Sequence, residues 1–300
     1  MQLGLGVAVL LISQCNWALA WGDVGHRTVA YVAENYLTED GSKFLDNLLP
    51  FSNNFDISDA ATWADEQKRR YPKTKPWHYV DIKDDPVHHK CDISSLDCPN
   101  GDCIISAMEA MTSQVSEYSF NRTEAVLFLV HFFGDLHMPL HVEGLCRGGN
   151  EIDVSFNGRN DNLHSIWDTD MPHKINGIKH SLKHNDEKTA SLKWAKDLIQ
   201  KNLHRPATVT ECNDVTQPQK CFKQWATESN HLNCAVVFKR GLQYLTTQDL
   251  AGDYYEDAVP VIEEQIFKAG VRLATWINSI AEKQHAKAAF VAQGSGSYEL

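Results

Sequence analysis

After its first twelve residues the chain lacks any long uncharged apolar run. Residues 3–12 form one such run, but no later stretch approaches the roughly 20 apolar residues that a membrane-spanning helix needs. The sequence also shows no repeat at a fixed period, which argues against a solenoid. Residues 21–300 are enough to bury a substantial core. We therefore expect one compact domain that does not span a membrane.

Positive charge is in short supply. The chain has 28 Lys and Arg against 39 Asp and Glu, a formal net charge of −11. Most proteins that bind nucleic acid use basic patches, so this composition disfavours a long footprint on duplex DNA. It does not exclude a site for a few nucleotides, because bound metal ions would supply positive charge locally.

The cysteines lack the Cys-x2-Cys spacing that is typical of zinc thiolate sites. Of the eight cysteines, Cys15 lies within the first 20 residues. In an oxidising compartment the other seven should pair and leave one over. Cys98 with Cys103, and Cys212 with Cys221, are close enough in sequence to close small loops. The one Asn-x-Ser/Thr sequon, at 121–123, also fits a secreted surface.

The first 20 residues are typical of a secretory signal peptide. The apolar run is followed by Ala18 and Ala20, small residues that signal peptidase accepts. We expect residues 1–20 to be removed and Trp21 to begin the secreted chain. A free α-amino group has a pKa of about 8, so its neutral form and the Trp21 carbonyl can chelate a metal, with His26 within reach. The alternative is an ordinary signal peptide before a helix with a core histidine.

Histidines and aspartates recur at spacings that suit metal binding. His131 and Asp135, and likewise His164 and Asp168, are four residues apart, so each pair would share one face of a helix. His131 alone would be read as a core histidine. A buried carboxylate is costly unless it is paired or bound to metal, so Asp135 weakens that alternative. Asp135 is also the best candidate to bridge two ions. The other candidate ligands are Asp65, His78 and His141, and His137 leaves a second chelate with His141 open.

Apolar residues at three- and four-residue spacing predict an all-α fold. Pro139 would end the helix that carries His131 and Asp135. The predicted helices cover residues 23–37, 104–118, 123–136, 189–203, 222–245 and 256–283.

A small β-hairpin is expected within this helical fold. Ile152, Val154 and Phe156 alternate with polar residues before Asn157 and Gly158, a typical hairpin turn. Residues 291–300 form a polar, glycine-rich end that we expect to be disordered.

These residues resemble a known family, the zinc-dependent, single-strand-specific secreted nucleases of moulds and plants. The resemblance spans nearly all of residues 21–300 and places nine candidate ligands in the family's order and spacing. It implies an all-α domain over residues 21–290 that is related to trizinc phospholipase C. The resemblance is carried by residues 21–26, 63–65, 77–79, 131–141 and 148–168.

The resemblance implies three zinc ions and assigns ligands to each. Asp135 is shared by the first and third ions. It also implies a disulfide between Cys91 and Cys234, which leaves Cys146 as the odd thiol. The ligand sets are Asp65, His78, His131 and Asp135 for the first zinc; His141, His164 and Asp168 for the second; and Trp21, His26 and Asp135 for the third.

The implied reaction is hydrolysis of single-stranded DNA and RNA at the P–O3′ bond, leaving 5′-phosphates, together with cleavage of 3′-nucleotides. Asp65 and Asp135 would serve catalysis through the metals. Lys68, one turn after Asp65, would contact phosphate as a point charge. The alternative for Lys68, within the run Lys-Arg-Arg at 68–70, is a solvated helix face.

Four further positions match the base pocket of the family. Tyr79 would stack on a base and Asp81 would accept hydrogen bonds from its edge, while Gly148 and Asn150 complete the pocket. The alternative for Tyr79 is packing within a β-prone stretch.

Two other functions stay open on the sequence alone, a phosphodiesterase like the trizinc phospholipases C and a zinc-binding protein without catalysis. Turnover of a choline phospholipid would identify the first. Metal binding without cleavage of nucleic acid would identify the second. We expect no obligate protein partner.

Overall fold

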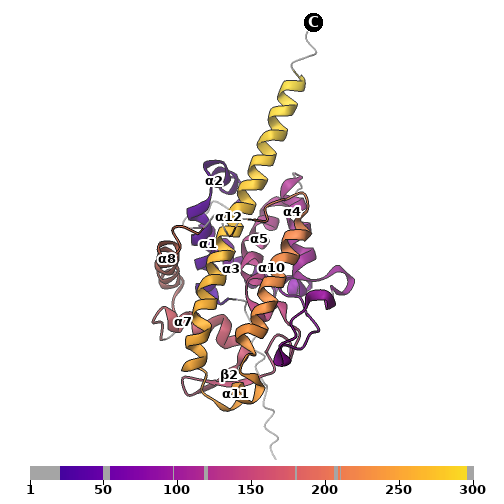
Figure 1. The fold of residues 1–300 in the computed structure, drawn as a ribbon. Coiled ribbons are helices and arrows are strands. Elements are labelled where there is room, and N and C mark those ends of the chain that lie inside the picture. The colour runs from indigo at the N-terminus through magenta and orange to yellow at the C-terminus, as the bar shows by residue number, and fades with distance from the viewer. Residues whose placement is uncertain are drawn as a thin grey trace, which may run out of the picture.

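Helix α12 (Asp253–Ser295) runs along the length of the molecule, and its C-terminal end projects beyond the other helices (Figure 1). The computed structural model describes residues 21–49, 55–96, 98–117, 121–179, 181–205, 209 and 211–295. The predicted signal peptide, residues 1–20, lies outside this part of the chain. Residues 296–300 also lie outside this part of the chain. Within the segment 291–300 that was expected to be disordered, residues 291–295 belong to α12.

Two buried helices form the centre of the fold. Helix α1 (Asp23–Tyr36) packs against α12, α8 (His184–Lys201) and α3 (Ile57–Gln67). Helix α5 (Arg122–Leu136) is buried without interruption from Ala125 to Leu136. A helix that is apolar all round belongs in a core. His131 and Asp135, the two polar residues in this stretch of α5, are therefore removed from water.

The expected all-α architecture with one small hairpin is confirmed. Strands β1 (Asp153–Phe156) and β2 (Arg159–Asn162) pair antiparallel. Asn157 and Gly158 connect them with φ of 53° and 71°, the left-handed conformation that a tight two-residue hairpin turn requires. In the described part of the chain, no helix is both long enough and apolar enough to cross a bilayer.

The predicted continuous helix over 222–245 is wrong. Helix α10 (Pro218–Leu232) gives way to a π-helical turn, η7 (Asn233–Val237), and α11 (Gly241–Thr247) begins at a glycine with φ of 74°. The Asn233 side chain donates to the carbonyl of Pro139 at 2.9 Å. This tertiary contact fixes the turn, and the spacing of apolar residues cannot reveal it.

The helices predicted near residues 23, 104 and 123 are present, with ends within a few residues. The sequence analysis did not identify α3. Its signal is a capping box, in which Asp56 accepts from the backbone of Asp59 while the Asp59 side chain accepts from the backbone of Asp56. The remaining elements are α2 (Glu39–Asp46), η1 (Pro72–His78), η2 (Pro86–His88), η3 (Ile93–Ser95), η4 (Pro99–Gly101), α4 (Ile104–Ser116), η5 (Pro139–Val142), α6 (Leu163–Ser165), η6 (Ile166–Asp170) and α7 (Met171–Ile175).

The disulfides follow the expected pairing. Cys146 is the free thiol of the described residues. The bridges are Cys91–Cys234, Cys98–Cys103 and Cys212–Cys221.

Candidate metal centre

The His and Asp residues expected to bind metal come from separate elements and meet around the C-terminal half of α5. They form three groups that could each hold an ion. Their side chains are at most 6% exposed. They are His26 on α1, Asp65 on α3, His78 at the end of η1, His131 and Asp135 on α5, His141 on η5, His164 on α6 and Asp168 on η6.

The first group has the spacing of a tetrahedral ligand shell. His78 Nδ1 lies 3.1 Å from His131 Nε2 and 2.9 Å from Asp135 Oδ2. Asp65 Oδ1 lies 3.6 Å from the same His78 nitrogen and 3.5 Å from the His131 nitrogen. Ligand atoms about 2.0–2.1 Å from zinc at the corners of a tetrahedron are about 3.3 Å apart. The four residues therefore match one zinc ion.

The second group contains two imidazole nitrogens, His141 Nε2 and His164 Nε2, that face each other. His141 Nδ1 donates to the carbonyl of His78, and His164 Nδ1 donates to the carbonyl of Gly148, each at 2.6 Å. When both rings are neutral, each Nε2 then carries a lone pair, and the two Nε2 atoms are 3.2 Å apart. Because two lone pairs at this distance repel, the arrangement calls for a cation between them. Asp168 Oδ2, 3.1 Å from His164 Nε2, completes the group.

Asp135 has one carboxylate oxygen toward each of two groups. Its Oδ2 lies near His78 and His131, whereas its Oδ1 lies 3.2 Å from His26 Nε2. The rings of His26 and His131 stack with their centroids 4.0 Å apart. A Cβ on residue 134 would lie 2.6 Å from His26 Nδ1, so Gly134 is what lets α1 approach α5 this closely. The geometry is that of a bridging carboxylate.

The protonation states of Asp65, His78 and His141 also suit metal binding. Burial opposes ionisation of Asp65, but positive charge on His131 and Lys68 lowers its pKa to about 2. Burial lowers the pKa of His78 to about 4 and that of His141 to about 3. At neutral pH the carboxylate is charged and these imidazoles are neutral, the forms that act as metal ligands.

Several ligand atoms are buried without a hydrogen-bond partner. A buried polar group that is left unpaired costs about 1–3 kcal/mol. Divalent cations would satisfy all of these atoms together, so the residues fit bound zinc. The atoms are His26 Nε2, Asp135 Oδ1 and both carboxylate oxygens of Asp168.

Trp21 is anchored beside the second group. The backbone N–H of the next residue, Gly22, donates to the carbonyl of Asp168 at 2.7 Å. The Trp21 side chain is fully buried, and a Cβ on Gly25 would lie 2.7 Å from its Cβ. Residue 21 is therefore held next to metal ligands by close packing at the start of α1.

Lys68 does not lie on a solvated helix face. It follows the last residue of α3, its side chain is 14% exposed, and its Nζ lies 2.5 Å from Asp65 Oδ1. Lys68 also lines the cavity above the metal centre. Its charge is therefore available next to the first group.

A cavity of about 930 Å³ joins the metal ligands to the expected base pocket. Tyr79 is 41% exposed there, so the alternative that it serves only as a packing residue does not hold. Gly148 has φ of 59°, and a Cβ at that position would collide with the carbonyl of Leu140. The cavity wall includes Tyr79, Asp81, Gly148 and Asn150 together with His78, His141 and His164.

Two histidines outside the predicted set have other partners. His137 Nδ1 donates to the carbonyl of Phe133 at 2.7 Å, and its Nε2 accepts from Arg272 at 2.9 Å. Both ring nitrogens are thus used, which removes the possible chelate with His141. His184, to which no functional role was assigned from the sequence, contacts Arg27 at 2.9 Å.

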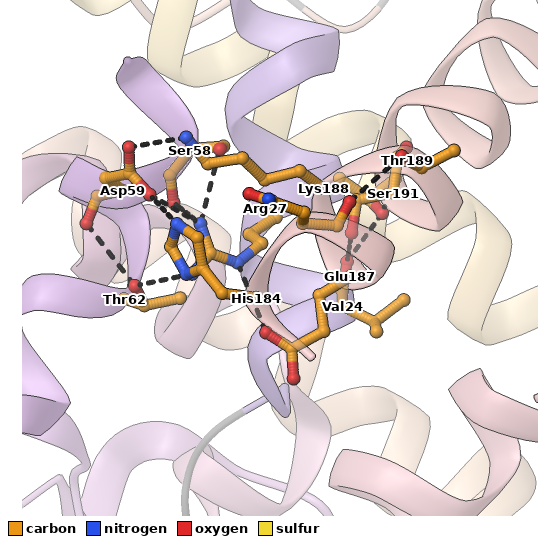
Figure 2. Close-up of polar contacts among 12 residues, drawn as sticks. Val24, Arg27, Ser58, Asp59, Thr62, His184, Glu187, Lys188, Thr189 and Ser191 are labelled. Atoms are coloured by element: carbon orange, nitrogen blue, oxygen red, sulfur yellow. Dashed lines mark hydrogen bonds and ion pairs between the residues drawn. The ribbon is translucent and has the colours of Figure 1, made fainter. Parts of the chain in front are cut away.

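Arg27 is the centre of a second buried polar cluster, which the sequence analysis missed (Figure 2). Its Nη1 donates to Asp59 Oδ1 at 2.9 Å and to the Ser58 carbonyl at 3.1 Å. Lys188 on α8 donates to Asp59 Oδ2 at 2.6 Å. These contacts join α1, α3 and α8 behind His26. Arg147, on the rim of the cavity, was also missed; its place next to Gly148 was the available signal.

Comparison with known proteins agrees with this geometry. The family model described as S1/P1 Nuclease matches residues 21–282. Nuclease PA3 of a Penicillium species is 39% identical over 89% of this chain and all of its own length. Nuclease P1 of Penicillium citrinum is 38% identical over the same shares, and Nuclease S1 of Aspergillus oryzae is 36% identical over 94% of this chain and 98% of its own. The chain belongs to the S1/P1 nuclease family.

Proposed function

We propose that this nuclease hydrolyses single-stranded DNA and RNA at the P–O3′ bond, leaves 5′-phosphates, and also cleaves 3′-nucleotides. The observation that supports this most is one cavity whose wall combines His78, His141 and His164, from two of the buried ligand groups, with an exposed aromatic ring, Tyr79. A base stacked on that ring would bring its phosphate toward the ligand groups. A paired base could not reach such a ring without leaving its stack.

Three zinc ions are proposed, each held by one set of ligands. When bound, zinc acidifies water and neutralises charge that develops on phosphate oxygens. The first set is Asp65, His78, His131 and Asp135; the second is His141, His164 and Asp168; and the third is the Trp21 amine and carbonyl with His26 and Asp135.

The protein's own side chains would bind and orient the substrate. Lys68 places a positive charge beside Asp65 and would contact a phosphate oxygen. Tyr79 would stack on the base, and Asp81 would accept hydrogen bonds from its edge. The backbone turn at Gly148 brings the main chain close to the ligands His164 and His141, and Asn150 would border the base.

The third zinc set links the proposed function to secretion. A metal-binding amine at Trp21 exists only after residues 1–20 are removed, so cleavage of a signal peptide would complete the site. Asn121, exposed at the start of α5, could carry a glycan. The two alternative functions have no observation in their favour, since the family and its named relatives are nucleases.

The proposal is tested by mapping product ends on a labelled single-stranded oligonucleotide, with the same sequence as a duplex for control. We expect cleavage of the single strand that leaves 5′-phosphate and 3′-hydroxyl ends, stops with a chelator and returns with zinc. Products that end in 3′-phosphate, or equal cleavage of the duplex, would contradict it. Release of phosphate from a 3′-nucleotide tests the second activity.

A further inference from the structure

Arg147 lines the same cavity as Tyr79 and Asp81, and nothing above assigns it a role. Its side chain is 74% exposed, and its ion-pair contact with Glu151, at 3.7 Å, is longer than a hydrogen bond. A guanidinium carries five N–H donors and no acceptor. Arg147 therefore presents donors to whatever enters the cavity.

The loop that carries Arg147 is held in an unusual conformation. Cys146 and Arg147 have φ of 49° and 56°, and the next two residues, Gly148 and Gly149, also have positive φ. L-residues in this region are strained and persist only where the surroundings enforce them. Such strain concentrates at functional sites, so the position of Arg147 is a built feature of the fold.

Two hydrogen bonds tie this loop to both sides of the cavity, and a third lies within the loop. Gly144 N–H donates to the Ile82 carbonyl at 3.0 Å, which ties the loop to the segment that carries Asp81. The carbonyl of Gly148 accepts from the ligand His164 at 2.6 Å. The Asn150 side chain donates to the carbonyl of Arg147 itself at 2.8 Å. Arg147 is thus placed between the metal ligands and the base-binding side chains.

The charge of Arg147 reaches both pocket side chains. Burial raises the pKa of Asp81, and Arg147 is the strongest charge that opposes this rise. Burial and Asp81 raise the pKa of Tyr79, and Arg147 again acts in the opposite direction. The guanidinium and the Asp81 carboxylate therefore act within one small site.

The pocket contains one side chain that only donates hydrogen bonds, Arg147, and one that only accepts them, the Asp81 carboxylate. This pair can form more hydrogen bonds with one base than with the others. A carboxylate accepts two adjacent N–H groups, which guanine offers at N1 and N2. A guanidinium donates to two adjacent acceptors, which guanine offers at O6 and N7. Adenine places an acceptor beside its amino group, as cytosine does, and uracil flanks its single N–H with carbonyls. Only guanine satisfies both side chains with paired hydrogen bonds.

We propose that Arg147 is a specificity-determining residue which, together with Asp81, makes the base pocket prefer guanine. This inference rests on the proposed function, because it requires a base stacked on Tyr79.

The test compares guanine with adenine, both in binding and in cleavage. Inhibition constants are measured for the 5′-monophosphates GMP and AMP, and kcat/KM for the dinucleotides GpU, UpG, ApU and UpA. The variants are Arg147→Gln, which removes the charge, and Arg147→Lys, which keeps the charge without the fork. Arg205→Gln, at an exposed residue paired with Glu264 outside the cavity wall, is the control for loss of surface charge. Zinc content and circular dichroism establish that each variant is folded and loaded.

We expect the wild type to favour guanine by at least about fivefold, the lower end of what a bidentate pair with a base provides. Both Arg147→Gln and Arg147→Lys should bring the ratio close to one, whereas Arg205→Gln should leave it unchanged. An unchanged ratio in Arg147→Gln would overturn the inference. Equal weakening for both bases with a shallower salt dependence would also overturn it, because Arg147 would then contact phosphate.

A further variant separates this inference from the proposed function. If Tyr79→Ala weakens the binding of all nucleotides while Arg147→Gln leaves the preference for guanine over adenine unchanged, only the role of Arg147 is wrong. If Tyr79→Ala has no effect on any nucleotide, the base pocket itself fails, and the proposed function fails with it.

Discussion

Two neighbouring residues on α1, His26 and Arg27, enter two different buried polar clusters. Around Arg27, opposite charges meet directly, because Asp59 accepts from both Arg27 and Lys188 (Figure 2). Only Arg27 Nε there lacks a hydrogen bond, and it lies 3.8 Å from Glu187 Oε2. Around His26, the carboxylates of Asp135 and Asp168 keep buried oxygens without a partner.

The difference shows two ways to tolerate buried charge. In the Arg27 cluster the protein supplies both signs of charge, and the cluster joins three helices. In the metal centre the ring N–H groups of His131, His141 and His164 point away to backbone carbonyls. When these rings are neutral, the atoms that face inward are acceptors, and bound cations would supply positive charge beyond that of Lys68. We therefore expect that loss of a carboxylate in the metal centre releases metal. Loss of a carboxylate in the Arg27 cluster should instead lower the free energy of unfolding of the protein.

The largest effect is expected for Asp135→Asn. The amide keeps the size of the side chain but cannot bridge two cations, so zinc should be lost and kcat should fall by at least about 10³-fold, as expected when the metal that activates water is lost. Zinc analysis and single-turnover kinetics measure both. Wild-type turnover with a full zinc content would refute the bridging role.

An extension of one residue before Trp21 should have the next largest effect. An amide nitrogen replaces the free amine, so the third zinc should be missing while the chain stays folded. Loss of one ion that stabilises the phosphate costs several kcal/mol, a rate loss of about 10²-fold or more. Mass spectrometry and zinc analysis of active protein provide the check. Full activity and three zinc ions in the extended protein would count against the chelate.

Asp59→Asn should act on stability and not on metal. Removing one partner from a buried ion pair costs about 3–5 kcal/mol, measured by urea unfolding at neutral pH, while the zinc content should stay that of the wild type. Burial opposes ionisation of Asp59, yet its bonds from Lys188 and Arg27 lower its pKa. Its contribution is therefore present above the ordinary carboxyl pKa and is lost as the pH falls through the lowered value, so the difference between variant and wild type should shrink in acid. If Asp59→Asn lost zinc but kept the free energy of unfolding of the wild type, the proposed difference between the two clusters would be wrong.

Tyr79→Ala should have the smallest effect of this series. It removes a stacking surface worth about 1–3 kcal/mol per base, so KM for single strands should rise while the zinc content is unchanged. The acidic surface also predicts that binding depends only weakly on salt. The slope of log K against log salt concentration should correspond to on the order of one to three neutralised phosphate charges. A steep salt dependence would point to a long electrostatic groove and would speak against the base pocket.

Two pairs of the candidate metal ligands could be predicted because their signal is local. His131 with Asp135, and His164 with Asp168, are four residues apart, and the structure brings both pairs into one centre. The all-α fold and the hairpin also followed from short-range patterns. Asn157 and Gly158, for example, predict their turn from two adjacent residues, although Asp249 also accepts hydrogen bonds from both of their backbone N–H groups.

The features that were missed depend on contacts between distant segments. Arg27 looks like an ordinary helix residue until α3 and α8 pack against it. The break before Gly241 depends on the contact of Asn233 with Pro139. Arg147 gains its place from a left-handed backbone that Ile82 and His164 enforce from far away in sequence.

The most direct test of the metal centre is anomalous X-ray scattering at the zinc absorption edge from crystals of the protein that begins at Trp21. The account predicts three peaks, one between Asp65, His78, His131 and Asp135, one between His141, His164 and Asp168, and one between Trp21, His26 and Asp135. A fully active crystal form with fewer than three peaks, or with zinc away from these residues, would contradict it.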